Sequence, residues 1–128
     1  MEEIKRDFYK NGNLRKEIYC KNGLLHREDG PAYINYFINE EVEKEYYKNG
    51  RRHRENGPAI IKHYEDGKIY YESYYINGKL HREDGPARIW YGYDGITIWS
   101  KEYYLNGEQV TDEFQLLVIE TLEKEKCK

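Results

Sequence analysis

A seven-residue segment occurs three times in this chain, and this recurrence restricts the possible folds more than any other feature. The copies read His-Arg-Glu-Asp-Gly-Pro-Ala at residues 26–32 and 81–87, and His-Arg-Glu-Asn-Gly-Pro-Ala at residues 53–59. They are spaced by 27 and then 28 residues, and an Asn-Gly dipeptide precedes each copy. A regular period of this length is typical of stacked copies of one supersecondary unit. Residues present in every copy are therefore first of all candidates for structural roles.

Two kinds of turn signal alternate along the chain. Asn-Gly occurs at 22–23, 49–50, 77–78 and 106–107, and Asp-Gly occurs at 66–67 and 94–95, with Asn11-Gly12 in the same register. The segments between the turns are rich in Tyr, Ile, Thr and Trp, which favour strands. Both dipeptides favour type I′ hairpin turns, in which both central residues have positive φ. Residues 37–42 lack this glycine, so we expect a wider or more mobile turn there, with Asn39 in the left-handed region.

The predicted fold class is mainly β, an elongated antiparallel β-meander of about three hairpin repeats of 27–29 residues, capped by one C-terminal α-helix. We expect a single repeat domain over residues 1–128. The β-repeats are expected over residues 8–110 and the capping helix over 111–126.

The predicted helix begins with a recognisable cap. Asp112 and Gln115 have the spacing of a capping box. The apolar stripe that we expect to cover the last hairpin consists of Phe114, Leu117, Val118, Thr121 and Leu122, flanked by Leu116 and Ile119. The alternative role of this helix is to join two copies of the chain as a homodimer.

Tyrosine supplies much of the surface that the chain can bury. There are 15 tyrosines, and 16% of the residues are aromatic. A tyrosine ring can be buried while its hydroxyl stays in water, which suits a sheet with an exposed face. The formal net charge of −3 gives no general attraction to nucleic acid.

Cysteine content and hydropathy indicate the cellular setting. Cys20 and Cys127 are too few for a disulfide framework or a zinc site. No N-terminal apolar segment resembles a secretory signal, and no segment has the apolar length of a membrane span. We therefore expect a cytoplasmic location and no membrane association.

The repeated histidines could be taken for catalytic or metal-binding residues. Equivalent residues of successive hairpins, however, lie about 10–15 Å apart, whereas a shared metal ion needs ligand atoms at about 2 Å. We predict that His26, His53 and His81 are structural, each packing on a tyrosine ring and bonding to the backbone of its own loop. The sequence contains no nucleophile motif, phosphate loop or metal-ligand cluster, so we predict a protein that is not an enzyme and needs no metal or cofactor.

The other residues of the repeated loop have predicted structural roles too. Arg27, Arg54 and Arg82 are expected to pair with Glu and Asp carboxylates of the same or the next repeat. The loop glycine is expected to provide positive φ, and the proline to direct the next residue into a strand.

Some aromatic residues exceed what the repeat requires, and they are the candidate partner contacts, together with two arginines. They are Tyr71, Trp90, Tyr91, Tyr93 and Trp99, with Arg51 and Arg52. Tyr, Trp and Arg carry most of the binding energy in protein interfaces. We expect Trp90 and Trp99 to face each other across the Asp94-Gly95 hairpin.

These features favour a non-catalytic protein-binding module, an inhibitor of an intracellular effector or nuclease, which is a monomer or a weak homodimer. The alternative is a nucleic-acid-binding protein that uses stacked aromatic rings and a basic stripe. That stripe would comprise Arg15, Lys16, Lys48, Arg51, Arg52, His53, Arg54 and Lys62.

The pattern Tyr-Tyr-x-Asn-Gly-x-x-His-Arg-Glu-Asp-Gly-Pro-Ala, which starts at Tyr74, resembles a MORN-like repeat family in its long variant with two hairpins per unit. The resemblance covers about residues 8–110. Similar repeats occur in phage, giant-virus and bacterial proteins, some of them antitoxin-like. The resemblance implies a single-layer β-meander with a binding role, and an anti-CRISPR type of phage inhibitor is one concrete subclass.

Overall fold

The computed structural model describes residues 1–126 of the 128-residue chain. Its strands are β1 (Glu2–Phe8), β2 (Leu14–Lys21), β3 (Leu24–Leu25), β4 (Tyr33–Tyr36), β5 (Val42–Glu45), β6 (Tyr47–Lys48), β7 (Arg51–Arg52), β8 (Ile60–His63), β9 (Ile69–Ser73), β10 (Tyr75–Ile76), β11 (Lys79–Leu80), β12 (Arg88–Tyr91), β13 (Ile98–Glu102), β14 (Tyr104–Leu105) and β15 (Glu108–Gln109). One helix follows, α1 (Glu113–Glu125).

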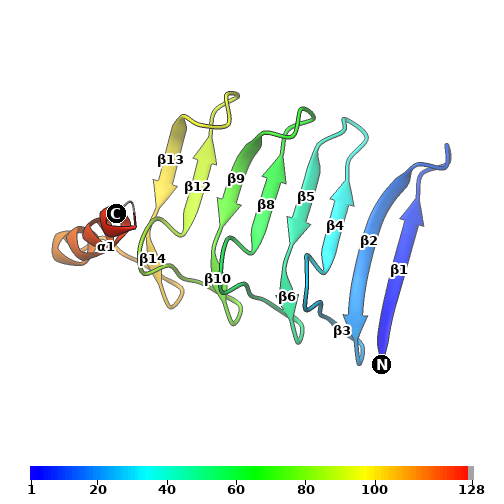
Figure 1. The fold of residues 1–128 in the computed structure, drawn as a ribbon, viewed down its shortest axis with the longest axis horizontal. Helices are drawn as coiled ribbons and strands as arrows, with labels where there is room; N and C mark the ends of the chain where they lie inside the picture. The colour runs from blue at the N-terminus through cyan, green and yellow to red at the C-terminus, as the bar shows by residue number, and fades with distance from the viewer. Residues whose placement is uncertain (127–128) are drawn as a thin grey trace.

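A single antiparallel sheet runs the length of the molecule, in the order β1-β2-β4-β5-β8-β9-β12-β13. Strand β3 pairs with β2, and the short pairs β6–β7, β10–β11 and β14–β15 form separate hairpins. Figure 1 shows one layer of strands, with the N-terminus at one end and α1 at the other. The predicted fold class is thereby confirmed, and the sheet already begins at Glu2, ahead of the predicted start at residue 8.

Each repeat contains one long and one short hairpin. In the middle repeat the chain runs down β5 and β6, turns at Asn49-Gly50, returns as β7, and passes through the loop 53–59 into β8. The turns of the long hairpins lie along one edge of the sheet, and those of the short hairpins along the opposite edge (Figure 1). The core between the loops and the sheet is thin. At its centre lie the alanines that end the repeated loops, Ala32, Ala59 and Ala87, which are fully buried.

The two kinds of dipeptide form different turns. In the four Asn-Gly turns of the short hairpins both residues have positive φ, as at Asn49 (49°) and Gly50 (81°), so the type I′ prediction is confirmed there. At Asn11-Gly12, which is a long-hairpin turn, only the glycine has positive φ. In the Asp-Gly turns only the glycine is left-handed, as at Gly67 (90°), so the same prediction is wrong for them. The Tyr64 N–H donates to Lys68 O and the Gly67 N–H donates to Tyr64 O. The Asp66 carboxylate accepts the Lys68 N–H within this three-residue turn, and Asp66 does not have positive φ.

The turn between β4 and β5 has the same geometry without a glycine. The Phe37 N–H donates to Glu41 O and the Glu40 N–H donates to Phe37 O, both at 2.9 Å. Glu40, with φ 70°, occupies the position of the glycine. The Asn39 side-chain oxygen accepts the Glu41 N–H, just as the Asp66 carboxylate accepts the Lys68 N–H. The prediction of a wider turn with Asn39 in the left-handed region is therefore wrong.

Glu40→Gly is expected to raise the free energy of unfolding by about 0.5–1 kcal/mol. A left-handed non-glycine residue costs roughly 1–2 kcal/mol, and the extra backbone entropy of glycine offsets about half of this gain. Urea denaturation measures the change. The control is Glu65→Gly in the next turn, at a position of ordinary φ, which should bring no gain. A Glu40→Gly variant no more stable than the parent would contradict the assignment.

Helix α1 closes the sheet, but with a face other than the predicted one. The Asp112 carboxylate accepts the Gln115 N–H at 3.0 Å, so the predicted cap is confirmed. Ile119, only 2% exposed, packs with Tyr103 and Val110, and Leu116 borders this cluster. The predicted stripe stays in solvent: Phe114, Leu117, Val118 and Leu122 are 39–72% exposed. The last short hairpin presents only a small apolar surface, which the narrower face of Leu116 and Ile119 covers.

Candidate binding surface at the long-hairpin turns

The repeated histidines connect each repeat to the next one. The Nδ1 atoms of His26, His53 and His81 accept backbone N–H groups at 2.9–3.0 Å, and the donors are Asn49, Asn77 and Asn106 of the following Asn-Gly turns. The sequence predicts that each histidine bonds to the backbone of its own loop. This prediction is wrong, because the backbone group that it bonds belongs to the next repeat. Because Nδ1 is an acceptor, the proton of the neutral ring lies on Nε2.

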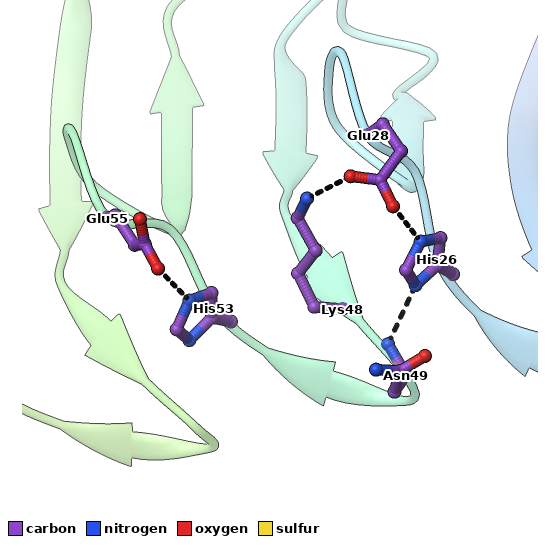
Figure 2. Close-up of polar contacts among 6 residues, drawn as sticks. All are labelled: His26, Glu28, Lys48, Asn49, His53 and Glu55. Carbon is purple, nitrogen blue, oxygen red and sulfur yellow. Dashed lines mark hydrogen bonds and ion pairs between the residues drawn. The ribbon is translucent and has the colours of Figure 1, made fainter.

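The Nε2 side of each imidazole faces the glutamate two residues later. Figure 2 shows His26 between Glu28 and the Asn49 N–H, with Lys48 on the other oxygen of Glu28. Hydrogen bonds from Lys48 and His26 lower the pKa of the Glu28 carboxyl to about 2. The corresponding distances are longer in the later repeats, 3.5 Å for His53–Glu55 and 3.4 Å for His81–Glu83. These contacts fix the orientation of the ring, so that Nδ1 points to the N–H group of the next repeat and accepts its hydrogen bond.

The repeated arginines lie on tyrosine rings. Guanidinium-to-centroid distances are 3.8–4.0 Å, for the pairs Arg27–Tyr19, Arg54–Tyr46 and Arg82–Tyr74. Each Nη1 also donates to the carbonyl of the loop proline at 3.1 Å. The predicted pairing with carboxylates is confirmed for Arg82, which lies 3.4 Å from Asp84 of the same loop, and is wrong for Arg27 and Arg54.

The loop glycine is needed because the arginine comes close to it. A Cβ added at Gly57 would lie 3.0 Å from Arg54 Nη1, and one at Gly85 would lie 2.7 Å from the Arg82 guanidinium carbon. Neither glycine has positive φ, so the predicted conformational reason is wrong. Together these contacts explain why the segment is repeated: its arginine fixes the loop to the sheet, and its histidine fixes the loop to the next repeat.

While some exposed large apolar side chains lie on β1 and on α1, others lie at the opposite edge, on the turns of the long hairpins. We call this surface the turn rim and define it as residues 37–41, 64–68 and 92–97, with Tyr70, Ile98 and Trp99. Among its members, Ile38, Tyr93, Ile96 and Trp99 are 61–83% exposed. Scattered apolar residues are normal on a surface, whereas a contiguous group marks an interaction site.

Four aromatic rings form a continuous row across the last two turns of the rim. Tyr70 contacts Tyr64 at 4.8 Å between ring centroids, Tyr64 contacts Tyr93 at 5.4 Å, and Tyr93 contacts Trp99 edge-on at 5.4 Å. The row begins half-buried at Tyr70 and ends exposed at Trp99. Packing against Tyr64 and Gly92 holds the two exposed rings in place.

The last turn departs from the repeat in two ways that create this surface. Its closing hydrogen bond joins Gly92 N to Thr97 O, which makes the turn one residue longer than the turn at Tyr64, and Ile96 is the added residue. Gly92 also stands where the other turns carry an aromatic ring. The Trp99 indole fills that space: a Cβ at Gly92 would lie 2.8 Å from Trp99 Nε1. The added residue is visible in the sequence as the longer spacing between Gly95 and Gly107.

The rim is acidic. It carries one lysine, Lys68, against five carboxylates, those of Glu40, Glu41, Glu65, Asp66 and Asp94. Hydrogen bonds from the Thr97 hydroxyl and from the Ile96 and Thr97 N–H groups lower the pKa of Asp94 to about 2. Partial burial and the neighbouring carboxylate of Glu41 raise the pKa of the Tyr70 hydroxyl to about 12. The rim therefore presents neutral rings among ionised carboxylates at physiological pH.

The candidate contacts from the sequence do not form one patch. Tyr93 and Trp99 meet in the rim. Tyr71 is 8% exposed and packs with Trp90 on one face of the sheet, at 5.3 Å. Trp90 pairs with Ser100 and not with Trp99, so the expected tryptophan pair is wrong.

The other three candidates lie elsewhere in the molecule. Tyr91 points to the opposite face from Trp90, and its hydroxyl donates to Glu72. Arg51 is exposed on a short hairpin, at the far edge from the rim, whereas Arg52 donates to the buried Glu45. The sequence missed Tyr64, Tyr70 and Ile96 as members of the site.

Most cations of the predicted basic stripe already have protein partners. The carboxylate pairs are Arg15–Asp7, Lys48–Glu28, Arg52–Glu45 and Lys62–Glu43, and Arg54 lies on Tyr46. An open groove of about 840 Å³ lies between the first two repeated loops, and its lining includes the paired residues Lys48, Glu28, Arg54 and Tyr46 together with Arg51 and His53. The nucleic-acid alternative therefore gains no support from their placement.

Residues 1–126 contain no group of three or more His, Cys, Asp or Glu side chains placed to hold a metal ion. Within the same residues, no helix has the length and apolar character needed to cross a membrane. Cys20 is a half-buried free thiol in β2, and Cys127 lies outside the described residues.

Comparison of the chain with protein-family models, curated proteins and solved structures finds no match. The resemblance to MORN-like repeats stays a prediction, and functional proposals depend on the geometry of the chain itself.

Proposed function

We propose that this protein is a non-catalytic binding module that recognises another protein through the turn rim. The observation that carries the proposal is the exposed pair Tyr93–Trp99, which is held in place by its neighbours and belongs to one copy of the repeat only. A feature that the repeat does not need for stacking is free to serve binding. Rigid aromatic side chains contribute most to protein interfaces at small entropic cost.

The charge of the rim supports a partner with basic side chains. Carboxylates pair with lysine and arginine, and the faces of tyrosine and tryptophan rings attract the same cations. Nucleases and other nucleic-acid-handling effectors have basic surfaces of this kind. We therefore propose an inhibitor of such an effector, acting in the cytoplasm.

Trp99→Ala and Tyr93→Ala are each expected to weaken partner binding by about 2 kcal/mol, or roughly 30-fold. The partner would first be captured from the native host with the full chain and then purified. Binding of each variant would be measured by calorimetry and stability by thermal unfolding. We expect lost affinity, unchanged stability, and weaker binding of the parent at high salt.

The matched control is Arg51→Ala, which removes an exposed candidate side chain from the opposite edge of the sheet and should leave binding intact. Binding that survives both rim substitutions would refute the rim as the site. A loss of stability equal to the loss of affinity would show that Tyr93 and Trp99 are structural.

A further inference from the structure

Helix α1 covers the end of the sheet but is itself left with an apolar outer face. Phe114 is 72% exposed, Leu117 60%, Val118 44% and Leu122 39%. Terminal caps of stacked repeats normally turn a polar face to water. A helix of this length also has little stability of its own, and Ile119 is its one buried residue. The outer face therefore has the character of a contact surface.

We propose that a second copy of this chain covers this face, with the two α1 helices packed antiparallel about a twofold axis. Phe114, Leu117, Val118 and Leu122 follow one side of the helix at intervals of three and four residues. Antiparallel pairing centred near Val118 places Phe114 against Leu122 of the second copy. The same patch then serves both partners, as a twofold interface requires.

The charges on α1 favour a second copy of the helix as the partner, in the antiparallel orientation. Glu113 and Lys124 are both exposed and lie eleven residues apart, about three turns, so they project from the same side. In the antiparallel pair each Glu113 faces Lys124 of the other copy. In a parallel pair each Glu113 would lie about three turns along the axis from Lys124 of the other copy, so the two could not pair. Antiparallel packing also brings each helix N-terminus to the C-terminus of its partner, where the helix dipoles attract.

The size of the contact sets the expected affinity. The helix is about 20 Å long, so the contact falls at the small end of specific interfaces. We expect a dissociation constant on the order of 10 µM. The dimer would carry two turn rims and would bind a partner with two sites more tightly than one copy does. The dimer does not depend on the function proposed for the rim, and its test needs no binding partner.

Sedimentation velocity of the full chain over a range of concentrations tests the proposal. We expect reversible dimers that Leu117→Asp abolishes. Glu113→Lys and Lys124→Glu should each weaken association about tenfold, because each places like charges opposite each other twice. An equimolar mixture of these two variants should recover the parent affinity, because every substituted position then faces an opposite charge.

The control substitution is Glu108→Lys, which reverses an exposed charge on β15 outside the helix and should leave association unchanged. Circular dichroism checks that α1 stays folded in each variant. A chain that is monomeric at concentrations far above the expected dissociation constant would overturn the proposal. So would dimers that survive Leu117→Asp, or a variant mixture that fails to associate.

Discussion

Arg54→Ala is expected to lower the free energy of unfolding by about 2–4 kcal/mol. The substitution removes a guanidinium 4.0 Å from the Tyr46 ring, worth about 1 kcal/mol, and a charged hydrogen bond to Pro58 O, worth about 1.5–3 kcal/mol. It also leaves the space beside Gly57 empty. Urea denaturation of the full chain measures the loss.

Two substitutions test whether the geometry of Arg54 matters, as distinct from its charge. Arg54→Lys should recover less than half of the loss, because an ammonium group cannot lie flat on a ring and reach the carbonyl at once. Arg51→Ala removes an exposed arginine three residues away and should change stability by less than about 0.5 kcal/mol. Equal effects of Arg54→Ala and Arg51→Ala would contradict the assigned role of the stacked arginine.

Ile119→Asp is expected to detach α1 from the sheet, at a cost of about 3 kcal/mol or more. Ile119 is 2% exposed between Tyr103 and Val110, so an aspartate there would be a buried charge without a partner. The helix would separate from the sheet before accepting that charge. Hydrogen exchange should show lost protection over residues 113–125 and at Val110, with the central strands still protected.

Val118→Asp is the matched control, because Val118 is the neighbouring residue and is 44% exposed. At protein concentrations too low for association it should leave α1 protected. If Ile119→Asp also left the helix protected, the packing of α1 on the last hairpin would be refuted.

The histidines show how far sequence reasoning reaches. Their period and their distance from one another predicted structural roles, and the structure gives each a structural hydrogen bond. The donor of each bond is the N–H group of an asparagine 23–25 residues further along, in the next repeat. The last short hairpin has Val110 where the others have histidine, and its N–H donates to Tyr103 as that of His81 donates to Tyr74. With no further repeat to hold, an imidazole there would have no N–H to accept.

Local chemistry by itself determined the repeat, the Asn-Gly hairpins, the meander and the capped helix. These features depend on backbone preferences of a few adjacent residues, repeated at a fixed period. Only the tertiary structure decided which face of α1 is buried and that Trp99 fills the space above Gly92. It also decided that the exposed rings gather in one acidic rim. Such choices depend on which distant surfaces meet, and packing between elements overrides the apolar stripe that a single helix displays.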